Sequence, residues 1–431
     1  MLQLDAERPA RNARDRARIG LAVAGGGPIG GMWELGALHA LADGIDGLDL
    51  TDLHVYVGVS SGSFLAAGLA NGLDTAEMAR IFLTGDSREA VFHPESFVRP
   101  ALFEYMKRAA GMPRMMLDWM AELARHPFGA RLSDAVLRFG SLLPTGLFDN
   151  ESVEAFLREM FTGPGRSNDF RQLRRKLYLI AVELDSGKAV RLGGPGHDDV
   201  PISRAVEASA ALPGLYPPVR IGGRWYVDGA LARTLHASAA LDQGATLVFA
   251  VNPLVPYNAD RTPGTGRAAP ESLIEGGLPA VLSQTFRTLL TSRMQTGLGK
   301  YAQAYPQADM LLFEPRADEV ELFFTNLFSY SHRRRVAELA WRVVRADLRR
   351  NAETLAPLLA RHGLALHHER LAAADRSLEA SLRLHPARDA ATASLNAALN
   401  DLDGALRRRK AASTATTKKP ASGRRRSATG R

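Results

Sequence analysis

The sequence predicts an α/β protein built on a parallel sheet. Two short apolar runs, residues 19–24 and 54–57, each end in a glycine-rich turn and are followed by a helical pattern. Strand–turn–helix units repeated in this way are typical of parallel sheets covered by helices. The composition agrees, because 46% hydrophobic and 23% charged residues among 431 are ordinary for a folded protein. Disorder of the whole chain and a fibrous protein are therefore excluded.

The first 70 residues hold an arm and the two repeated units. Residues 1–18 are polar and rich in arginine, so we expect a flexible N-terminal arm. The first strand leads through three glycines into a helix at 30–42, and the second leads into a helix at 63–70. The short spacing between each strand and its helix favours helices that pack directly on the sheet.

The middle of the chain completes the predicted domain. Residues 75–162 are mostly helical in pattern, and their methionine-rich stretch at 102–120 suits either an acyl channel or a core helix. Further elements are expected as strands at 176–184, 189–192 and 246–251, a helix at 203–212 and a hairpin at 220–227. We assign residues 19–255 to one α/β domain.

The composition changes after residue 255. Residues 256–270 form a linker rich in Pro, Gly and Thr, and 271–406 follow a helical period. Within this region, the aromatic and basic stretch 321–341 suits either helix packing or a membrane interface. Residues 407–431 carry ten basic and no acidic side chains, and we expect a disordered basic tail. Subtracting this tail from the net charge of +8 leaves −2 for the rest of the chain.

Several classes of protein are excluded by what the sequence lacks. The chain has no cysteine, which excludes disulfides, zinc–thiolate sites and a cysteine nucleophile. No run of about 20 apolar residues predicts a transmembrane helix, and the N-terminal segment lacks the apolar centre of a secretory signal. We therefore interpret the protein as cytoplasmic.

The turn after the second strand has the pattern of a nucleophile elbow. Gly58 and Gly62 flank Ser60 with one residue on either side. In a strand–turn–helix unit this spacing exposes the serine oxygen at the positive end of the following helix, and the glycines keep side chains away from the sharp bend. The alternative is a plain turn rich in Ser and Gly.

The turn after the first strand can hold negative charge. Gly25, Gly26, Gly27 and Gly30 place backbone N–H groups at a helix N-terminus. Two uses compete, a dinucleotide fingerprint and an oxyanion hole for acyl transfer. The nearby serine elbow favours the oxyanion hole, because a dinucleotide site needs no activated serine.

A nucleophilic serine also needs a base. His236 is the best placed of the downstream histidines, although a packing or surface role fits it better than a catalytic triad. Asp228 directly follows a predicted strand and precedes Gly229, which allows close approach of the backbone. An aspartate can act as the base if the serine is hydrogen-bonded to it; the alternative is an ordinary Asp-Gly turn.

Together these motifs resemble those of patatin-like phospholipases. The resemblance rests on the turn at 25–30, the elbow at 58–62, the stretch at 208–218 that begins Ala-Ser-Ala-Ala-Leu-Pro, and Asp228-Gly229-Ala230. It covers roughly residues 19–252. The order and spacing of all four motifs make a chance match remote.

The resemblance implies a fold, an activity and a set of roles. The fold would be a three-layer α/β/α patatin-like sheet with helical insertions and a helical C-terminal extension. The activity would be hydrolysis of lipid acyl esters, as in a phospholipase A, through a dyad of Ser60 and Asp228. The oxyanion hole would be formed by Gly25, Gly26 and Gly27, without a metal or other cofactor.

Two departures from the family pattern keep alternatives open. Ile29 stands where the family usually has a basic residue, and residues 232–236 lack the usual Asn-x-Pro stretch. We favour an active hydrolase, because the nucleophile, the aspartate and the glycines are present. The alternatives are a nonhydrolytic lipid-binding or scaffold protein on the same fold, and a polyanion-binding protein that acts through the basic tail.

The expected partners follow from substrate and charge. A lipid ester substrate implies contact with a membrane or lipid surface. We therefore expect a cytoplasmic protein that can also lie peripherally at such a surface. The tail at 407–431 suits nonspecific polyanion contact or anionic lipid. It has no aromatic residue to stack on bases, so we expect no specific nucleic-acid recognition.

Overall fold

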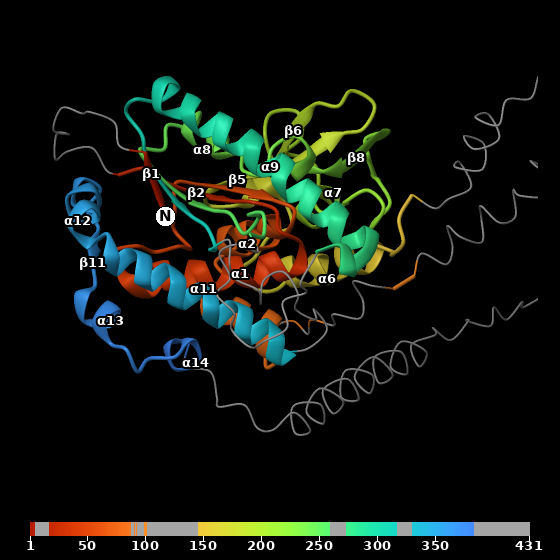
Figure 1. The fold of residues 1–431 in the computed structure, drawn as a ribbon. Helices are drawn as coiled ribbons and strands as arrows, with labels where there is room; N and C mark the ends of the chain where they lie inside the picture. Colours follow the sequence, from red (N-terminus) through yellow and green to blue (C-terminus); the bar gives the residue numbers. More distant parts are fainter. Residues whose placement is uncertain are drawn as a thin grey trace, which may run out of the picture. The chain divides into compact units, whose positions relative to one another are not determined.

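Within the residues that the structure describes, a nine-stranded sheet forms the centre of the fold (Figure 1). The structure is a computed structural model that describes residues 1–4, 17–87, 90, 92, 99–100, 145–258, 273–316 and 330–382. All of these belong to one unit, Met1–Arg383. The methionine-rich stretch 102–120, most of the linker 256–270, residues 321–329 and the tail 407–431 lie outside the described residues.

The sheet has parallel strands at its centre and antiparallel strands at its edges. The neighbouring pairs from β10 through β9, β2 and β4 to β5 are parallel, and the outer pairs are antiparallel. β6 (Ala189–Leu192) pairs with β5 off this path. Along the path of hydrogen-bonded neighbours, the strands are β1 (Leu2–Leu4), β10 (Asp309–Phe313), β9 (Leu247–Val251), β2 (Ile19–Val23), β4 (Val55–Val59), β5 (Lys176–Glu183), β8 (Arg224–Asp228) and β7 (Val219–Ile221).

The central strands confirm the prediction of an α/β protein with a parallel sheet. β4, β9 and β10 are buried along their whole length, as is β2 after its first residue. Such continuous apolar strands are expected where helices cover both faces of a sheet. The predicted strands at 19–24, 54–57 and 246–251 correspond to β2, β4 and β9.

Two strands of this sheet lie outside the residues that the sequence assigned to the α/β domain. β10 pairs in parallel with β9, and β1 pairs with β10 in antiparallel register, Gln3 opposite Leu311. The sequence placed the first of these in a helical region and the second in a flexible arm. β10 joins the sheet because its five residues are all buried there, next to β9. β1 in turn covers the edge of β10, whose backbone N–H and C=O groups would otherwise lack strand partners.

Helices cover both faces of the sheet, so the fold has three layers. One face carries α1 (Gly27–Gly44), α2 (Ser61–Ala70) and, packed against α1, α11 (Tyr330–Arg350). The other face carries α8 (Ala237–Leu241) and α9 (Gly277–Ala304), with Ala240 and Leu298 in one core cluster with Val57. Figure 1 shows the two groups of helices on opposite sides of the strands.

Shorter elements connect these layers. A two-stranded sheet joins β3 (Ile45–Asp46) to β11 (Ala365–Leu366). The single-turn elements are the π-helical turn η1 (Arg80–Thr84) and the 3₁₀ turns η3 (Phe170–Gln172), η4 (Gly229–Leu231) and η6 (Leu273–Gly276). The remaining helices are α3 (Thr75–Ala79), α6 (Glu151–Phe161), α7 (Ile202–Ser209), α12 (Ala352–Arg361), α13 (His368–Ala372) and α14 (Leu378–Ser381).

Helix α1 is buried on almost all sides, although the sequence predicts only an apolar stripe. The sheet covers one side, and α11 covers the other at very short range. A Cβ atom at Gly36 would collide with the backbone carbonyl of Ala337 on α11. Glycine at this position therefore lets the two helix backbones approach each other. The contact ties the C-terminal helical region to the sheet layer.

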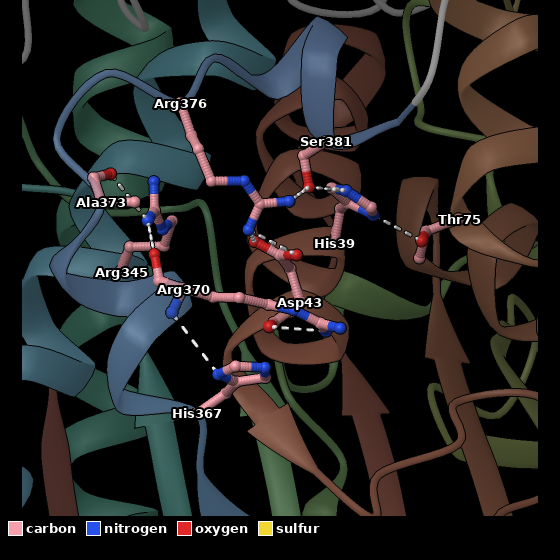
Figure 2. A network of polar contacts seen from close by, with 9 residues as sticks. All are labelled: His39, Asp43, Thr75, Arg345, His367, Arg370, Ala373, Arg376 and Ser381. Carbon is pink, nitrogen blue, oxygen red and sulfur yellow. Dashed lines mark hydrogen bonds and ion pairs between the residues drawn. The ribbon is translucent and has the colours of Figure 1, made fainter.

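A buried polar network fastens the C-terminal elements to α1, as Figure 2 shows. The guanidinium of Arg376 donates two hydrogen bonds to the Asp43 carboxylate, at 2.9 and 3.0 Å. The His39 ring bonds Thr75 Oγ1 through Nδ1 at 2.8 Å and Ser381 Oγ through Nε2 at 2.9 Å. Burial lowers the pKa of His39 to about 4, so its ring is neutral at pH 7. The network thus holds α14 against α1 without a charged histidine.

Candidate active site

The turn between β4 and α2 has the geometry of a strained elbow. Ser60 has φ = 51° and ψ = −121°, and it is the only non-glycine residue with positive φ in the part of the chain that the structure describes. A Cβ at Gly58 would lie 2.6 Å from Ser63 Cα, and one at Gly62 would collide with the Ala24 carbonyl oxygen. Both glycines are therefore required by close backbone approach, as the sequence pattern predicts.

A buried serine on another helix supports this elbow. Ser209, the last residue of α7, is fully buried. Its Oγ accepts a hydrogen bond from the Ser60 N–H at 2.9 Å and donates one to the Ile180 carbonyl at 2.6 Å. The Ser209 hydroxyl thus joins the strained residue to the middle of β5. The sequence contains this residue within the 208–218 stretch, but the pattern assigned it no role.

The register of β5 brings Ser60 beside Asp228. Ile180 pairs with Val59, the residue before Ser60, and the next residue, Ala181, pairs with Asp228. Because β6 pairs with the same two residues of β5, it occupies one edge of β5. The ends of β4 and β8 must therefore meet on the other edge. This meeting point is a property of strand pairing and has no local sequence signal.

The Asp228 carboxyl group is buried and lines the same cavity as Ser60. It also accepts a hydrogen bond from the Ala230 N–H at 2.8 Å. Burial raises its pKa to about 6, and the Ser60 hydroxyl and the Ala230 N–H oppose a larger rise because they favour the charged form. At pH 7 this carboxyl group is mostly ionised and carries its charge in a water-poor place.

The glycine turn that precedes α1 lies directly against Ser60. A Cβ at Gly25 would be 2.9 Å from Ser60 Cβ, so no side chain fits there. Gly27 has φ = 63°, in the left-handed region that glycine tolerates. No described residue accepts a hydrogen bond from the N–H groups of Gly25, Gly26 or Gly27. These donors therefore stand at a helix N-terminus beside the serine, where the sequence predicts them.

A largely apolar cavity of about 510 Å³ contains Ser60 and Asp228. Leucines and phenylalanines make up much of its wall, with side chains from α1, α2 and α9. Among the described residues of its wall, the charged ones besides Asp228 are Glu207, Arg287 and Arg333. Burial raises the pKa of Glu207 to about 7, although its ion pair with Arg204 opposes the rise. The cavity is wide enough for an apolar chain next to the serine.

The two arginines reach the cavity from helices outside the predicted domain. Burial lowers the pKa of Arg287 to about 10, so it stays charged at pH 7, and its Nη1 donates to the Val255 carbonyl at 3.3 Å. Arg333 is 2% exposed and donates from Nη1 to the Phe82 carbonyl at 3.0 Å. The sequence placed Arg333 in an aromatic and basic stretch, but its position in the cavity depends on how α11 packs.

Histidine plays no part in the described cavity wall. None of the described lining residues is a histidine. His236, the best placed in the sequence, is buried at the start of α8, and burial lowers its pKa to about 4. Ile29 is half-buried in the first turn of α1 and is not among the described lining residues. No cluster of possible metal ligands occurs within the described part of the chain.

The sequence matches the family described as patatin-like phospholipase over residues 21–241. This match spans more than half of the chain and contains the elbow, the glycine turn and Asp228. The chain therefore belongs to the patatin-like phospholipase family. The family and the fold support lipid acyl hydrolase activity. A comparison with curated protein sequences finds no match.

Solved structures with similar folds are distant in sequence. VipD from Legionella pneumophila is 13% identical, with 80% of this chain and 70% of VipD covered at a TM-score of 0.36. ExoU from Pseudomonas aeruginosa, in complex with SpcU, is 15% identical, with coverages of 68% and 54% and a TM-score of 0.28. Human GIVD cytosolic phospholipase A2, in complex with methyl gamma-linolenyl fluorophosphonate, is 16% identical, with coverages of 55% and 39% and a TM-score of 0.22.

Among the described residues, none of the helices combines the length and the apolar character that a membrane crossing requires.

Proposed function

We propose that this protein is a serine acyl hydrolase that cleaves lipid acyl esters, as a phospholipase A does. One observation carries the proposal: Ser60, on a strained elbow, and the buried Asp228 line the same apolar cavity, where the Ser60 hydroxyl acts to lower the pKa of the Asp228 carboxyl group. A serine becomes nucleophilic when a base accepts its proton. In this proposal Asp228 is that base, without a histidine between them.

The pKa of Asp228 suits this role. A general base works best when its pKa lies near the working pH, because it is then ionised and still able to hold the proton it takes. An aspartate with its ordinary pKa of about 3.9 would be a weak base. Burial raises the pKa of Asp228 to about 6. The carboxylate is thereby stronger as a base and still ionised at pH 7.

The proposed first half-reaction is acyl transfer to the enzyme. Ser60 Oγ attacks the ester carbonyl carbon as its proton passes to Asp228. The carbonyl oxygen gains negative charge, and the N–H groups of Gly25, Gly26 and Gly27 donate hydrogen bonds to it. Removing one such donor typically costs about 10²–10³ in turnover. The tetrahedral intermediate then collapses, the proton goes to the leaving alcohol, and an acyl-serine remains.

The proposed second half-reaction releases the fatty acid. A water molecule gives its proton to Asp228 and attacks the acyl-serine carbonyl, and the same N–H groups stabilise the new oxyanion. Collapse returns the proton to Ser60 Oγ and frees the acid. The apolar wall of the cavity supports a long acyl chain as the substrate group, since burial of its methylenes favours binding.

A fluorophosphonate probe tests the nucleophile directly. The probe bonds covalently to an activated serine and releases fluoride. We expect the wild type to be labelled, Ser60→Ala to be unlabelled, and the exposed-turn control Ser186→Ala to be labelled like the wild type. No labelling of the folded wild type would favour the alternative of a nonhydrolytic lipid-binding or scaffold protein.

A second pair of variants tests the base. Asp228→Asn removes the negative charge with little change in shape, so we expect ester hydrolysis to be lost while the thermal transition is kept. His236→Ala removes the buried ring at the start of α8, and most activity per folded molecule should remain. The dyad would be refuted if the histidine variant were inactive and the aspartate variant active.

A further inference from the structure

The first half of α9, together with η6, exposes a set of large apolar side chains. Ile274 is 76% exposed, Leu278 69% and Leu289 52%. We call the whole set the α9 patch; its members are Ile274, Leu278, Val281, Leu282, Phe286 and Leu289. A soluble surface rarely gathers so many apolar side chains within a few helical turns, and such patches mark interaction sites.

The α9 patch occupies one side of the helix, and the side that packs on the sheet lies opposite. Leu278, Leu282, Phe286 and Leu289 recur at helical spacing and share a face. The core contacts come from a different face, on which Leu298 is buried. Because the helix packs with one apolar face and still presents another, its exposed leucines are not explained by the core of this unit.

The α9 patch is continuous with the wall of the cavity. Leu282 and Phe286 are nearly half exposed, and both also line the cavity that contains Ser60. On the inner side of the helix, Leu290 is buried and lines the same cavity. Leu282 and Phe286 thus belong both to the exposed α9 patch and to the wall of the cavity that contains Ser60.

The charge of α9 has a single sign. From Gly277 to Ala304 the helix contains Arg287, Arg293 and Lys300 and no acidic residue. Arg293 is exposed and donates to the Leu231 carbonyl at 3.2 Å. The α9 patch also has one acidic neighbour, Glu275 in η6, next to Ile274, but the exposed Arg293 and Lys300 outnumber it. An apolar face with an excess of exposed basic residues is the pattern of helices that lie in the interface of an anionic membrane.

We propose that the α9 patch is a docking surface for an anionic phospholipid bilayer. The apolar side chains would enter the boundary between headgroups and acyl chains, and the exposed Arg293 and Lys300 would meet lipid phosphates. The proposal rests on the proposed function, because a lipid ester must leave its bilayer to reach Ser60 and a dry apolar path makes that transfer easier. A second copy of the chain fits less well, since it would cover the entrance through which substrate must pass.

The test compares two matched double variants of the full chain. Leu278→Ser with Leu289→Ser removes exposed leucines of the α9 patch that do not line the cavity. Leu147→Ser with Leu184→Ser removes leucines of similar exposure, 51% and 49%, on other parts of the surface. Binding is measured by sedimentation with vesicles of phosphatidylcholine and phosphatidylglycerol in a ratio of about 3:1.

We expect the α9 variant to bind these vesicles roughly 10- to 100-fold more weakly than the wild type, from the loss of apolar insertion. The control variant should bind like the wild type. Hydrolysis of a soluble short-chain ester should be unchanged in both variants, because neither alters the cavity. Equal vesicle binding by the α9 variant and the wild type, or an equal loss in the control variant, would overturn the proposal.

Three further measurements distinguish lipid docking by the α9 patch from dimerisation and from docking by the tail. Ser60→Ala should bind vesicles like the wild type, so a failure of the proposed function would show in ester hydrolysis and leave the docking result readable. Light scattering of the wild type should show no dimer that Leu278→Ser with Leu289→Ser dissociates; such a dimer would mean that the patch binds a second copy.

Deleting residues 407–431 should leave vesicle binding dependent on the α9 patch. Loss of that dependence would assign the docking to the tail.

Discussion

Replacing Ser209 by alanine is expected to weaken catalysis from a position that touches no substrate. Its hydroxyl is the partner of two buried backbone groups, the N–H of Ser60 and the C=O of Ile180. Ser60 itself has a sparsely populated backbone conformation, which costs on the order of 1–3 kcal/mol and persists only where the surroundings hold it. Ser209 is one of the groups that hold it.

The size of the effect follows from these two bonds. In Ser209→Ala both backbone groups lose their partner, and each unsatisfied buried group costs about 1–3 kcal/mol. We therefore expect the free energy of unfolding to fall by roughly 2–6 kcal/mol. If the elbow relaxes, the Ser60 oxygen moves away from Asp228, and a displacement of about 1 Å can lower kcat by roughly 10²-fold.

The assay combines chemical denaturation with kcat on a soluble ester, measured for Ser209→Ala and for a matched control. The control is Ser203→Ala on the same helix, where a fully buried hydroxyl donates to Glu154 at 2.8 Å and accepts from Asn168 at 2.9 Å. Both variants should lose stability, and only Ser209→Ala should lose kcat. An unchanged kcat in Ser209→Ala, or an equal loss in the control, would refute the proposed support of the elbow.

Three further predictions concern pH and packing. Because the base must be ionised and burial raises the pKa of Asp228 to about 6, kcat/KM on a soluble ester should rise with pH and be about tenfold below its plateau at about pH 5; a flat profile down to that pH would contradict the assignment. Burial lowers the pKa of His39 to about 4, so on acidification this residue binds a proton in the unfolded chain before it does so in the folded chain. Between about pH 7 and about pH 5, the unfolding free energy of the wild type should therefore fall by about 2 kcal/mol more than that of His39→Gln. Equal losses in denaturant titrations at the two pH values would show that His39 is not held neutral. Gly36→Ala should lower the free energy of unfolding by about 1–3 kcal/mol, because the new methyl group meets the backbone of Ala337. Gly299→Ala is the control, since its methyl group has open space and should not destabilise the protein. Equal transition temperatures of the two variants in thermal unfolding would argue against the close helix contact.

Local patterns in the sequence predict the parts of the fold that depend on neighbouring residues. The strands before Gly25 and Gly58 are short apolar runs that end in glycines, and the helices after them follow directly. The structure confirms both units as β2–α1 and β4–α2. The strained backbone at Ser60 also follows from its neighbours. Gly58 and Gly62 are needed because other backbone atoms approach them closely, and both lie with Ser60 in one five-residue motif.

The remaining features depend on contacts between distant residues. Leu2–Leu4 is too short to be recognised as a strand and becomes one by pairing with β10. The meeting of Ser60 and Asp228 depends on the register of β5, so the Asp-Gly pair taken by itself fits an ordinary turn as well as a base. Arg333 enters the cavity wall because α11 packs closely on α1 at Gly36. Hydrophobic periodicity in the sequence does not predict which distant residues come into contact.

The shared edge of β5 gives the two halves of the candidate dyad unequal mechanical support. Ser60 follows β4, a buried central strand with partners on both sides. Asp228 ends β8, which pairs with β5 over three residues and whose other partner, β7, is the terminal strand of the sheet. Local opening needs less free energy at such a margin than in the centre. On heating, the base should therefore detach while most of the molecule is still folded, so inactivation would precede the melting of the sheet.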